Sequence, residues 1–470
     1  MRSRIRSIGL ILLGAVAGIL VSLNFQAIAE RAVRSPLPVE ELRAFTEVFG
    51  AIKSNYVEPV EDKKLITEAI NGMLSGLDPH SAYLDAEAYR DLQVGTQGQF
   101  GGLGIEVGIE DGFVKVVSPI EDTPAHRAGV KPGDLIVKLD DTPVKGMSLN
   151  DAVKRMRGKP GSQIVLTIAR KGEAQPIVVT LTRAVIRVQS VKSKVLEPGF
   201  GWIRVSQFQE ATTDALVKHL DGLYKQGTLK GLVLDLRNDP GGLLYGAIAI
   251  SAAFLPQKAL VVSTEGRTDD AKKKFYATTE DYLRGSGRDD VLRNLPAAVK
   301  SVPMVVLVNG GSASASEIVA GALQDHKRAT VIGTQSFGKG SVQTIMPLGN
   351  STAIKLTTAR YFTPNGRSIQ AKGITPDIIV EEPSDQAARV READLQRHLA
   401  NPVGGETGKD AAKNAPRKPA AGNGATAPAE LPKPLELGSK DDFQLAQALA
   451  FLKGEPVKGQ PSKAVAENKQ

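Results

Sequence analysis

Three serines lie close together in residues 309–317, which read NGGSASASE. An apolar stretch at 302–308 precedes them, and apolar residues at helical spacing follow, so we expect a turn between a buried strand and a helix. Backbone N–H groups at a helix N-terminus can hold an oxyanion beside a serine nucleophile. Ordinary helix capping accounts for one of Ser312, Ser314 and Ser316, which leaves two for chemistry.

A serine nucleophile needs a base. His326 lies twelve residues after Ser314 on the same predicted helix, about 18 Å away at 1.5 Å per residue, which is too far. Lys339 is the better candidate, because alternation along the strand predicted after it places Lys339, Ser341 and Gln343 on one face. A lysine acts as a base only where burial lowers its pKa towards neutrality. The alternative for Lys339 is a charged lysine on the surface.

Two other interpretations of the lysine turn fit less well. Residues 333–340, GTQSFGKG, nearly match a phosphate-binding loop, but Gly340 stands where a hydroxyl would bind magnesium, and a strand is predicted next instead of a helix. Ser336 and Lys339 have the Ser-x-x-Lys spacing of penicillin-recognising enzymes, but the companion motifs of those enzymes are absent.

Two glycine turns are candidate binding elements. The turn at 237–242 follows a buried strand predicted at 231–236, and its amides could complete an oxyanion hole or simply connect a strand to a helix. The run at 101–105, GGLGI, enters a predicted edge strand, where free N–H groups can capture a C-terminal carboxylate while the bound peptide adds a strand.

The remaining pattern places these motifs in an α/β protein with several parts. The apolar stripe of the N-terminal helical region fits a core or a dimer face equally well. Alternating strands and helices after about residue 199 predict a layered core with sites at strand ends. The predicted organisation is a helical region at 36–95, a β-rich module at 97–184, a core at 185–382 with a charged, lid-like insertion at 265–300, a low-complexity linker at 384–440 and a helix at 441–453.

Composition excludes several classes of protein. The 470 residues suggest about three domains. Cysteine is absent, which rules out disulfides and cysteine chemistry, and the five histidines are isolated. The net charge of +8 is spread along the chain with few aromatic residues, so nucleic-acid binding is not expected. We predict no metal and no cofactor.

The first 29 residues have the features of an export signal. Three positive charges precede an uncharged, mostly apolar stretch at 8–23, and a small-x-small pattern, Ala27-Ile28-Ala29, ends the segment. The stretch is close to the length that spans a bilayer, so it is predicted to be either cleaved or kept as a membrane anchor. Both outcomes predict an exported, periplasmic protein.

Taken together, the motifs resemble the carboxyl-terminal processing peptidases, also called tail-specific proteases. The resemblance covers roughly 40–382 and the helix at 441–453. It rests on residues 78–83 (DPHSAY), 100–105 and 128–134 of a PDZ domain, 236–242 (LRNDPGG), 311–317 (GSASASE), 338–343 (GKGSVQ) and 375–377 (TPD).

The resemblance implies a layered α/β, crotonase/Clp-like serine protease core with an inserted PDZ domain. It implies Ser314 as the nucleophile, Lys339 as the general base and Gln343 as the residue that orients the lysine. The implied oxyanion donors are the amides of Ala315 and one of Gly241 and Gly242.

The resemblance also implies partners. The PDZ domain would bind apolar C-termini of substrate proteins through Gly102, Leu103, Gly104 and Ile105, and Arg170 would couple it to the core. An activating adaptor protein and a homo-oligomer are further implications. A different class of function, a non-catalytic PDZ scaffold on an inactive core, would require Lys339 to be exposed and charged.

Overall fold

The computed structural model describes residues 38–110, 112–120, 122–284, 289–381, 390–403 and 436–461. Its contacts divide the chain into two compact units, Met1–Gly72 and Met73–Gln470. The predicted signal or anchor at 1–29 lies outside the described residues. None of the described helices combines the length and the apolar character needed to cross a membrane.

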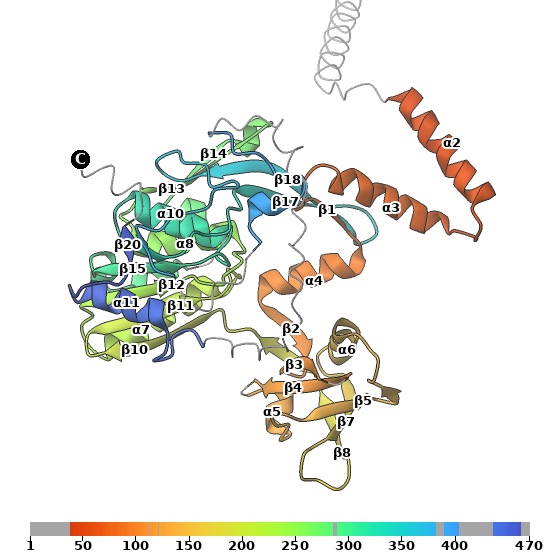
Figure 1. Ribbon diagram of the computed structural model, residues 1–470, viewed down its shortest axis with the longest axis horizontal. Coiled ribbons are helices and arrows are strands. Elements are labelled where there is room, and N and C mark those ends of the chain that lie inside the picture. The colour runs from red at the N-terminus through yellow and green to blue at the C-terminus, as the bar shows by residue number, and fades with distance from the viewer. Residues whose placement is uncertain are drawn as a thin grey trace, which may run out of the picture. The chain divides into compact units, whose positions relative to one another are not determined.

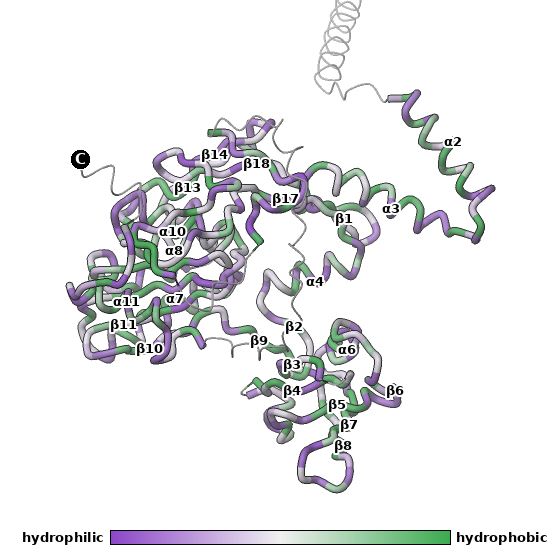
Figure 2. Tube along the Cα trace, in the orientation of Figure 1, coloured by the Kyte–Doolittle hydropathy of each residue, from purple (hydrophilic) through white to green (hydrophobic). Residues whose placement is uncertain are grey.

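The first unit contains helix α2 (Val39–Asn55) and most of α3 (Asp62–Ser75). Apolar and polar residues alternate along α2, as Figure 2 shows, but no residue of this helix is buried. Its apolar stripe, which includes Leu42, Phe45 and Val48, is exposed in this chain. The stripe therefore forms no core within the described residues, and its use as a dimer face stays a prediction.

A seven-stranded sheet forms the centre of the second unit (Figure 1). The five inner strands pair in parallel, and the two outer strands run antiparallel to their neighbours. Nearly continuous runs of Val, Ile and Leu, such as MVVLV, form the middle strands because both faces are covered. In spatial order the strands are β10 (Val191–Glu197), β11 (Phe200–Val205), β12 (Gly231–Asp235), β15 (Met304–Val308), β16 (Thr330–Gly333), β19 (Ile378–Ile379) and β20 (Gln460–Pro461).

Helices cover both faces of this sheet. On one face, inward residues such as Leu234 and Val306 pack with α7 (Thr212–Lys225), α8 (Leu244–Phe254) and α10 (Ala315–Asp325). On the other face, the alternate strand residues pack with the C-terminal helix α11 (Phe443–Leu452). The two-residue period of a strand explains this division. Helices α8 and α10 both start at the carboxyl ends of parallel strands, so the turns that precede them are neighbours.

A second sheet lies beside the core and carries the lysine turn. Its longest strand, β18 (Ala353–Phe362), pairs with β17 (Ser341–Pro347), with β13 (Leu260–Gly266) and with the short β1 (Ala82–Leu84). Strand β14 (Lys273–Tyr276) pairs with β13 at the edge. Residues 82–84, which lie in the region predicted to be helical, are therefore a strand of this sheet.

The β-rich module forms a separate sheet, with strand order β3-β4-β5-β7-β8. The hairpin expected around residues 110–112 is present as β3 and β4, and β3 is an edge strand. Helices α5 (Pro124–Arg127) and α6 (Leu149–Met156) accompany the sheet, while β2 (Gln99–Gly102) pairs with β9 (Ala184–Arg187). The strands are β3 (Ile105–Glu110), β4 (Phe113–Pro119), β5 (Leu135–Leu139), β6 (Thr142–Pro143), β7 (Gln163–Ala169) and β8 (Ile177–Thr182).

Two segments differ from the sequence-based expectation. The predicted irregular insertion at 265–300 contains part of β13, all of β14 and α9 (Thr279–Tyr282), and it buries Ala277 and Val299 in the main core. The predicted linker at 384–440 is only partly described. Within it, residues 390–403 pack against the core, and Glu392 is fully buried. Both segments are rich in charged and small residues, so their local sequence does not indicate regular structure. Their packing depends on contacts with segments that are distant in the chain.

A buried ion cluster anchors helix α11. The guanidinium of Arg237, at the end of β12, donates to Asp235 at 2.7 Å and to Asp442 at 2.6 Å. It also donates to Gln444 at 3.1 Å, and the side chain of Asp442 caps the helix by accepting from the amide of Leu445. Each buried charge thus has a partner. The C-terminal helix docks on the sheet through this cluster and its apolar face.

Removing the guanidinium should destabilise the fold. We expect Arg237→Met to lower the free energy of unfolding by about 3–5 kcal/mol, because Asp442 would stay buried without a counter-charge and Asp235 would keep only Arg204, at 3.6 Å. Denaturant unfolding followed by circular dichroism measures the change. Lys225→Met is the control. Lys225 pairs with Asp221 on the surface, so this substitution should lower the free energy of unfolding by less than about 1 kcal/mol. Equal stabilities for the two variants would contradict the role of the cluster.

Candidate active site

The turn after β15 gives its three serines different surroundings. Ser312 is buried, and its hydroxyl donates to the carbonyl of Leu236 at 2.8 Å. Ser316 is buried, and its hydroxyl donates to the carbonyl of Asp239 at 2.9 Å. Both therefore tie this turn to the glycine turn after β12. Ser314, the predicted nucleophile, is the only one of the three that is not buried.

Ser314 sits at the N-terminus of α10 in an unusual backbone conformation. Its φ is +56° and its ψ is −112°, in a region that non-glycine residues rarely adopt. Such a conformation persists only where surrounding contacts hold it. The amide of Ser314 donates to Glu317 at 2.8 Å, which supplies one of these contacts.

The carboxylate of Glu317 connects the serine turn to the lysine turn. Oε2 accepts from the amides of Ser314 at 2.8 Å and Lys339 at 2.9 Å. Oε1 accepts from the hydroxyl of Ser336 at 2.6 Å and the amide of Gly338 at 2.8 Å. Burial raises the pKa of Glu317 to about 7, against the effect of these four donors. Sequence analysis did not assign Glu317 a role, although Ser-x-x-Glu is a recognisable capping-box spacing.

Lys339 lies in the turn that leads into β17. Burial lowers the pKa of its ammonium group, and the nearby positive charge of Lys355 lowers it further, against the acidic groups of Glu392 and Glu317. In the part of the chain that the structure describes, its Nζ has no hydrogen-bond or ion-pair partner. A largely desolvated amine with no ion-pair partner among the described residues is the condition under which lysine can accept a proton near neutral pH.

Tyr361, on β18, is a further residue of the site that sequence analysis missed. Its hydroxyl donates to the carbonyl of Lys339, and its ring is almost completely buried. Burial raises the pKa of this phenol well above its usual value, so the hydroxyl stays protonated. The predicted strand alternation gave no indication of this contact, because β18 follows the lysine turn in sequence and returns beside it.

Gln343 points towards the same side of β17 as Ser341. Its Nε2 donates to Ser341 Oγ at 3.0 Å and to Thr357 Oγ1 at 3.2 Å. No described residue donates to its Oε1. A register irregularity between Val342 and Gln343 interrupts the pairing with β18, and Thr358 is skipped there. The structure thus records no bond between Gln343 and Lys339, and the orienting role of Gln343 stays a prediction.

The two turns also supply backbone amides. Within the described residues, the amides of Ala315 and Gly242 have no acceptor, whereas the amide of Gly241 donates to Asp239 Oδ1 at 2.8 Å. Gly241 must be glycine, because a Cβ there would lie 2.8 Å from the amide nitrogen of Ala315 and 2.7 Å from the carbonyl oxygen of Ala313. This close approach sets the glycine turn directly against the serine turn.

Asp239 is buried beneath this turn. Its Oδ1 accepts from Gly241, and Oδ2 has no partner among the described residues. Burial raises the pKa of Asp239 to about 8, and the hydrogen bond from Gly241 only partly offsets the effect. The carboxyl group is therefore protonated at neutral pH.

The predicted peptide-binding loop and Arg170 lie in the β-rich module. Among the described residues, the amides of Leu103 and Gly104 have no acceptor, and they precede the edge strand β3. Arg170 donates to both carboxylate oxygens of Asp134, at 2.7 and 2.8 Å, and to the carbonyl of Gly129. The structure therefore places the contacts of Arg170 within its own module, and a coupling role stays a prediction.

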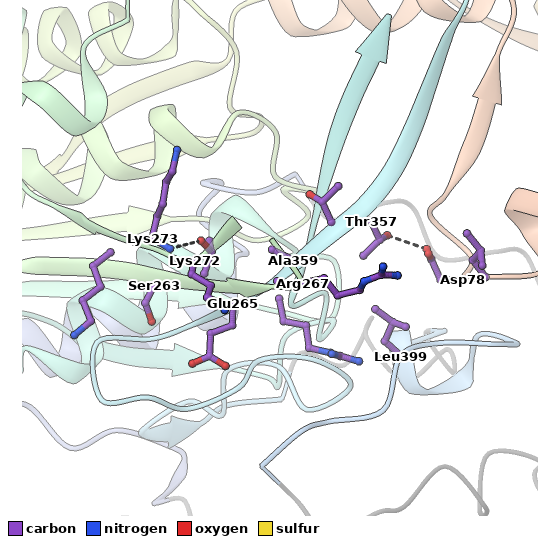
Figure 3. A pocket seen from close by; sticks show the side chains of 15 residues that line it. Asp78, Ser263, Glu265, Arg267, Lys272, Lys273, Thr357, Ala359 and Leu399 are labelled. Atoms are coloured by element: carbon purple, nitrogen blue, oxygen red, sulfur yellow. Dashed lines mark hydrogen bonds between the residues drawn. The ribbon is translucent and has the colours of Figure 1, made fainter. Parts of the chain in front are cut away.

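A cavity of about 960 Å³ lies beside β13, β14 and β18 (Figure 3). Its lining is strongly basic and includes Arg267, Lys272, Lys273, Lys274 and Arg360. Charged residues along an edge strand commonly prevent unwanted strand pairing. At one end of the cavity, Figure 3 shows Asp78 and Thr357 joined by a hydrogen bond, which measures 3.1 Å.

Comparisons with known proteins agree with this geometry. Residues 199–380 match the description "Peptidase family S41", residues 115–170 match "PDZ domain" and residues 20–88 match "Activating protease CtpB N-terminal domain". The chain is 44% identical over 450 residues to the "Carboxy-terminal-processing protease" of Bartonella bacilliformis, and the match covers 94% of this chain and 95% of the relative. The chain belongs to peptidase family S41.

Further S41 relatives match over shorter spans. The "Carboxy-terminal processing protease CtpB" of Bacillus subtilis is 37% identical over 341 residues, which are 72% of this chain and 67% of the relative. A solved "photosystem II D1 C-terminal processing protease" is 31% identical, covers 72% of this chain and 86% of its own, and has a TM-score of 0.41. The chain is thus a peptidase with a PDZ domain, and the predicted layered α/β fold class is confirmed.

Replacing Glu317 by Gln should disable the site. The new NH2 group would face two N–H or O–H donors on one side of the amide, so the serine and lysine turns would separate. We expect kcat to fall at least ~100-fold, because misplacement by about 1 Å has that effect. Protein-substrate cleavage measures kcat. Glu197→Gln, at an exposed pair with Lys453, is the control. Parental activity in Glu317→Gln would refute the role of Glu317.

The raised pKa of Asp239 predicts a pH-dependent stability. Between pH 3.8 and about 8 the folded chain keeps a proton that the unfolded chain releases, so the free energy of unfolding falls as pH rises through this window. The substitution Asp239→Asn removes the titrating carboxyl group, so the contribution of this group to the decline in the free energy of unfolding is absent from the variant. We expect the variant to gain stability relative to the parent as pH rises, and the difference to level off above pH 8. Urea unfolding at several pH values measures it; a difference independent of pH would contradict the assignment.

Proposed function

We propose that this chain is an exported serine endopeptidase that cleaves substrate proteins near their C-termini by a Ser314–Lys339 dyad. The observation that carries the proposal is that Glu317 Oε2 accepts hydrogen bonds from the amides of both residues. One carboxylate oxygen thereby sets the two backbones at a fixed separation. The lowered pKa of Lys339 and the unusual backbone of Ser314 support the same assignment.

The proposed reaction follows acyl-enzyme chemistry. Ser314 Oγ attacks the carbonyl carbon of the scissile bond, and its proton passes to the neutral Nζ of Lys339. The amides of Ala315 and Gly242, whose N–H groups meet no acceptor in the described part of the chain, hold the oxyanion. The lysine then gives the proton to the leaving amine. In the second step, a water molecule attacks the acyl-enzyme with Lys339 again as the base, and Ser314 Oγ leaves with the proton. Gln343 orients the amino group of Lys339.

We further propose that the PDZ domain selects the substrate. A peptide would add to the exposed edge of β3, and its terminal carboxylate would accept from the free amides of Leu103 and Gly104. Leu103 is buried in the core of this module, and Ile105 packs partly against it, so the loop is held in place from beneath. The apolar surroundings favour apolar C-terminal side chains. Export to the periplasm, by the segment at 1–29, and an activating adaptor belong to the same proposal.

The test compares the chain from about residue 30 with two single variants, Ser314→Ala and Lys339→Ala. We expect the parent to cleave an unfolded protein that ends in apolar residues, and each variant to lose at least ~1000-fold in kcat, as dyad or triad members do. Mass spectrometry of the products maps the cleavage sites. A second substrate that ends in aspartates should be cut more slowly if the PDZ domain reads the C-terminus.

Ser301→Ala, an exposed serine remote from the turns, is the matched control and should cleave like the parent. Cleavage at the parental rate by Ser314→Ala would contradict the proposed dyad. A parent that never cleaves, alone or with co-purified partners, would favour the non-catalytic PDZ scaffold.

A further inference from the structure

The side-chain amide of Gln343 has two ends with opposite hydrogen-bonding character. Only Oε1 can accept a hydrogen bond from the amino group of Lys339, and only Nε2 can donate. If Nε2 faced the lysine, it would donate to the Nζ lone pair, which must remain available for the proton of Ser314. The reaction therefore depends on which end of the amide faces the base.

Thr357, on β18, decides the orientation of this amide. Its Oγ1 lies 3.2 Å from Gln343 Nε2 and 3.1 Å from Asp78 Oδ1. A hydroxyl has one hydrogen to donate. If that hydrogen goes to Asp78, Thr357 can only accept from Gln343, so the end of the amide at Thr357 must be the NH2 group.

Asp78 can only accept hydrogen bonds at its contact with Thr357. It is 3% exposed, and its carboxylate also accepts from the hydroxyl of Ser81 at 2.7 Å and from the amides of His80 and Ser81 at 2.8 and 3.0 Å. Burial would raise the pKa of Asp78, but these hydrogen bonds and that of Thr357 outweigh it and hold the pKa below its usual value. Asp78 is therefore ionised and can only accept.

The opposite arrangement is unfavourable. If Thr357 donated to Gln343, its oxygen lone pair would face the buried carboxylate of Asp78 at 3.1 Å, and the two acceptors would repel each other. Ser341 Oγ, at 3.0 Å, adds a second acceptor for Gln343 Nε2. The contact with Thr357 thus favours this orientation, the contact with Ser341 is compatible with it, and Oε1 is left without a partner among the described residues.

We infer that Asp78 and Thr357 are positioning residues for this peptidase: the chain of hydrogen bonds from Asp78 through Thr357 to Gln343 fixes the amide with Oε1 available to Lys339. This inference rests on the proposed dyad, in which Lys339 is the base and Gln343 orients it. It assigns a function to the segment at 78–83, whose contacts with β18 bring it beside the lysine turn from more than 250 residues away in sequence.

Thr357→Val tests the inference, because valine keeps the shape of threonine and removes the hydroxyl. The amide of Gln343 would then adopt both orientations, so we expect kcat to fall ~10- to 100-fold with little change in KM. The lysine would meet an N–H donor in part of the population, so the pKa of the limb of the pH–rate profile that requires neutral Lys339 should fall. A loosened, wetter site would instead raise that pKa towards 10.5.

Two further variants separate this role from general damage. Thr357→Ser keeps a hydroxyl and should restore most of the activity. Thr358→Val removes the neighbouring hydroxyl, whose hydrogen-bond partner among the described residues is Thr344 on the exposed side of the same strands, and should match the parent. In a Gln343→Ala background, Thr357→Val should cause no further loss, because the group through which Thr357 acts is gone.

The inference is overturned if Thr357→Val keeps the parental kcat and pH profile. It is also overturned if the loss is the same in the Gln343→Ala background, or if Thr357→Ser is as impaired as Thr357→Val. These outcomes are distinct from failure of the proposed dyad, which would appear as cleavage by Ser314→Ala. Circular dichroism of each variant shows whether it is folded.

Discussion

The buried carboxylate of Glu317 is the interaction on which the geometry of this peptidase depends. Removing a carboxylate from water costs several kcal/mol unless hydrogen bonds replace those of the solvent. Here the donors come from two segments, the serine turn and the lysine turn, separated by about twenty residues. Each turn can satisfy only part of the carboxylate, so the cost is offset only when both are in place. The position of Ser314 relative to Lys339 is therefore tied to the stability of the fold.

A second constraint comes from the parallel sheet. Strands β12 and β15 are neighbours, and the turns at their carboxyl ends must pass each other closely. Gly241 makes the approach possible, and the hydroxyls of Ser312 and Ser316 fasten one turn to the carbonyls of the other. These contacts hold Ser314 in its strained conformation and leave the amides of Ala315 and Gly242 without an acceptor among the described residues. In the proposed reaction, rigidity beneath the turn provides donors that need no rearrangement when an oxyanion forms.

Distant segments enclose the lysine turn. Glu392 accepts from His80 and Gln370, and Gln370 in turn accepts from the amide of Gly340. Asp78 and Thr357 complete the surroundings on the side of Gln343. Residues from 78 to 392 therefore contribute to one buried polar network, in which each hydrogen bond constrains its neighbours. A lysine with a lowered pKa is a consequence of this enclosure.

Much of the fold and part of the site could be predicted from sequence, because the deciding signals are local. Apolar runs and glycine turns predicted the parallel strands and the helices that follow them, and the motifs around Ser314 and Lys339 predicted a peptidase, which the comparisons confirmed. Local sequence patterns do not predict contacts between segments that are far apart in the chain. Residues 82–84 lie in a region predicted to be helical and form a strand, and residues 390–403 lie in a predicted linker and pack against the core.

The sequence by itself determined which residue types are present and which turns they occupy. Only the tertiary structure decided what each of them does. Among the described residues, it buried Ser312 and Ser316 in hydrogen bonds and left Ser314 partly exposed, and it occupied the amide of Gly241 while leaving that of Gly242 without an acceptor. It also gave Glu317, Tyr361 and Asp78 their contacts. The physical reason is that burial and hydrogen-bond partners, which set reactivity and pKa, arise from neighbours that the folded chain brings together across hundreds of residues.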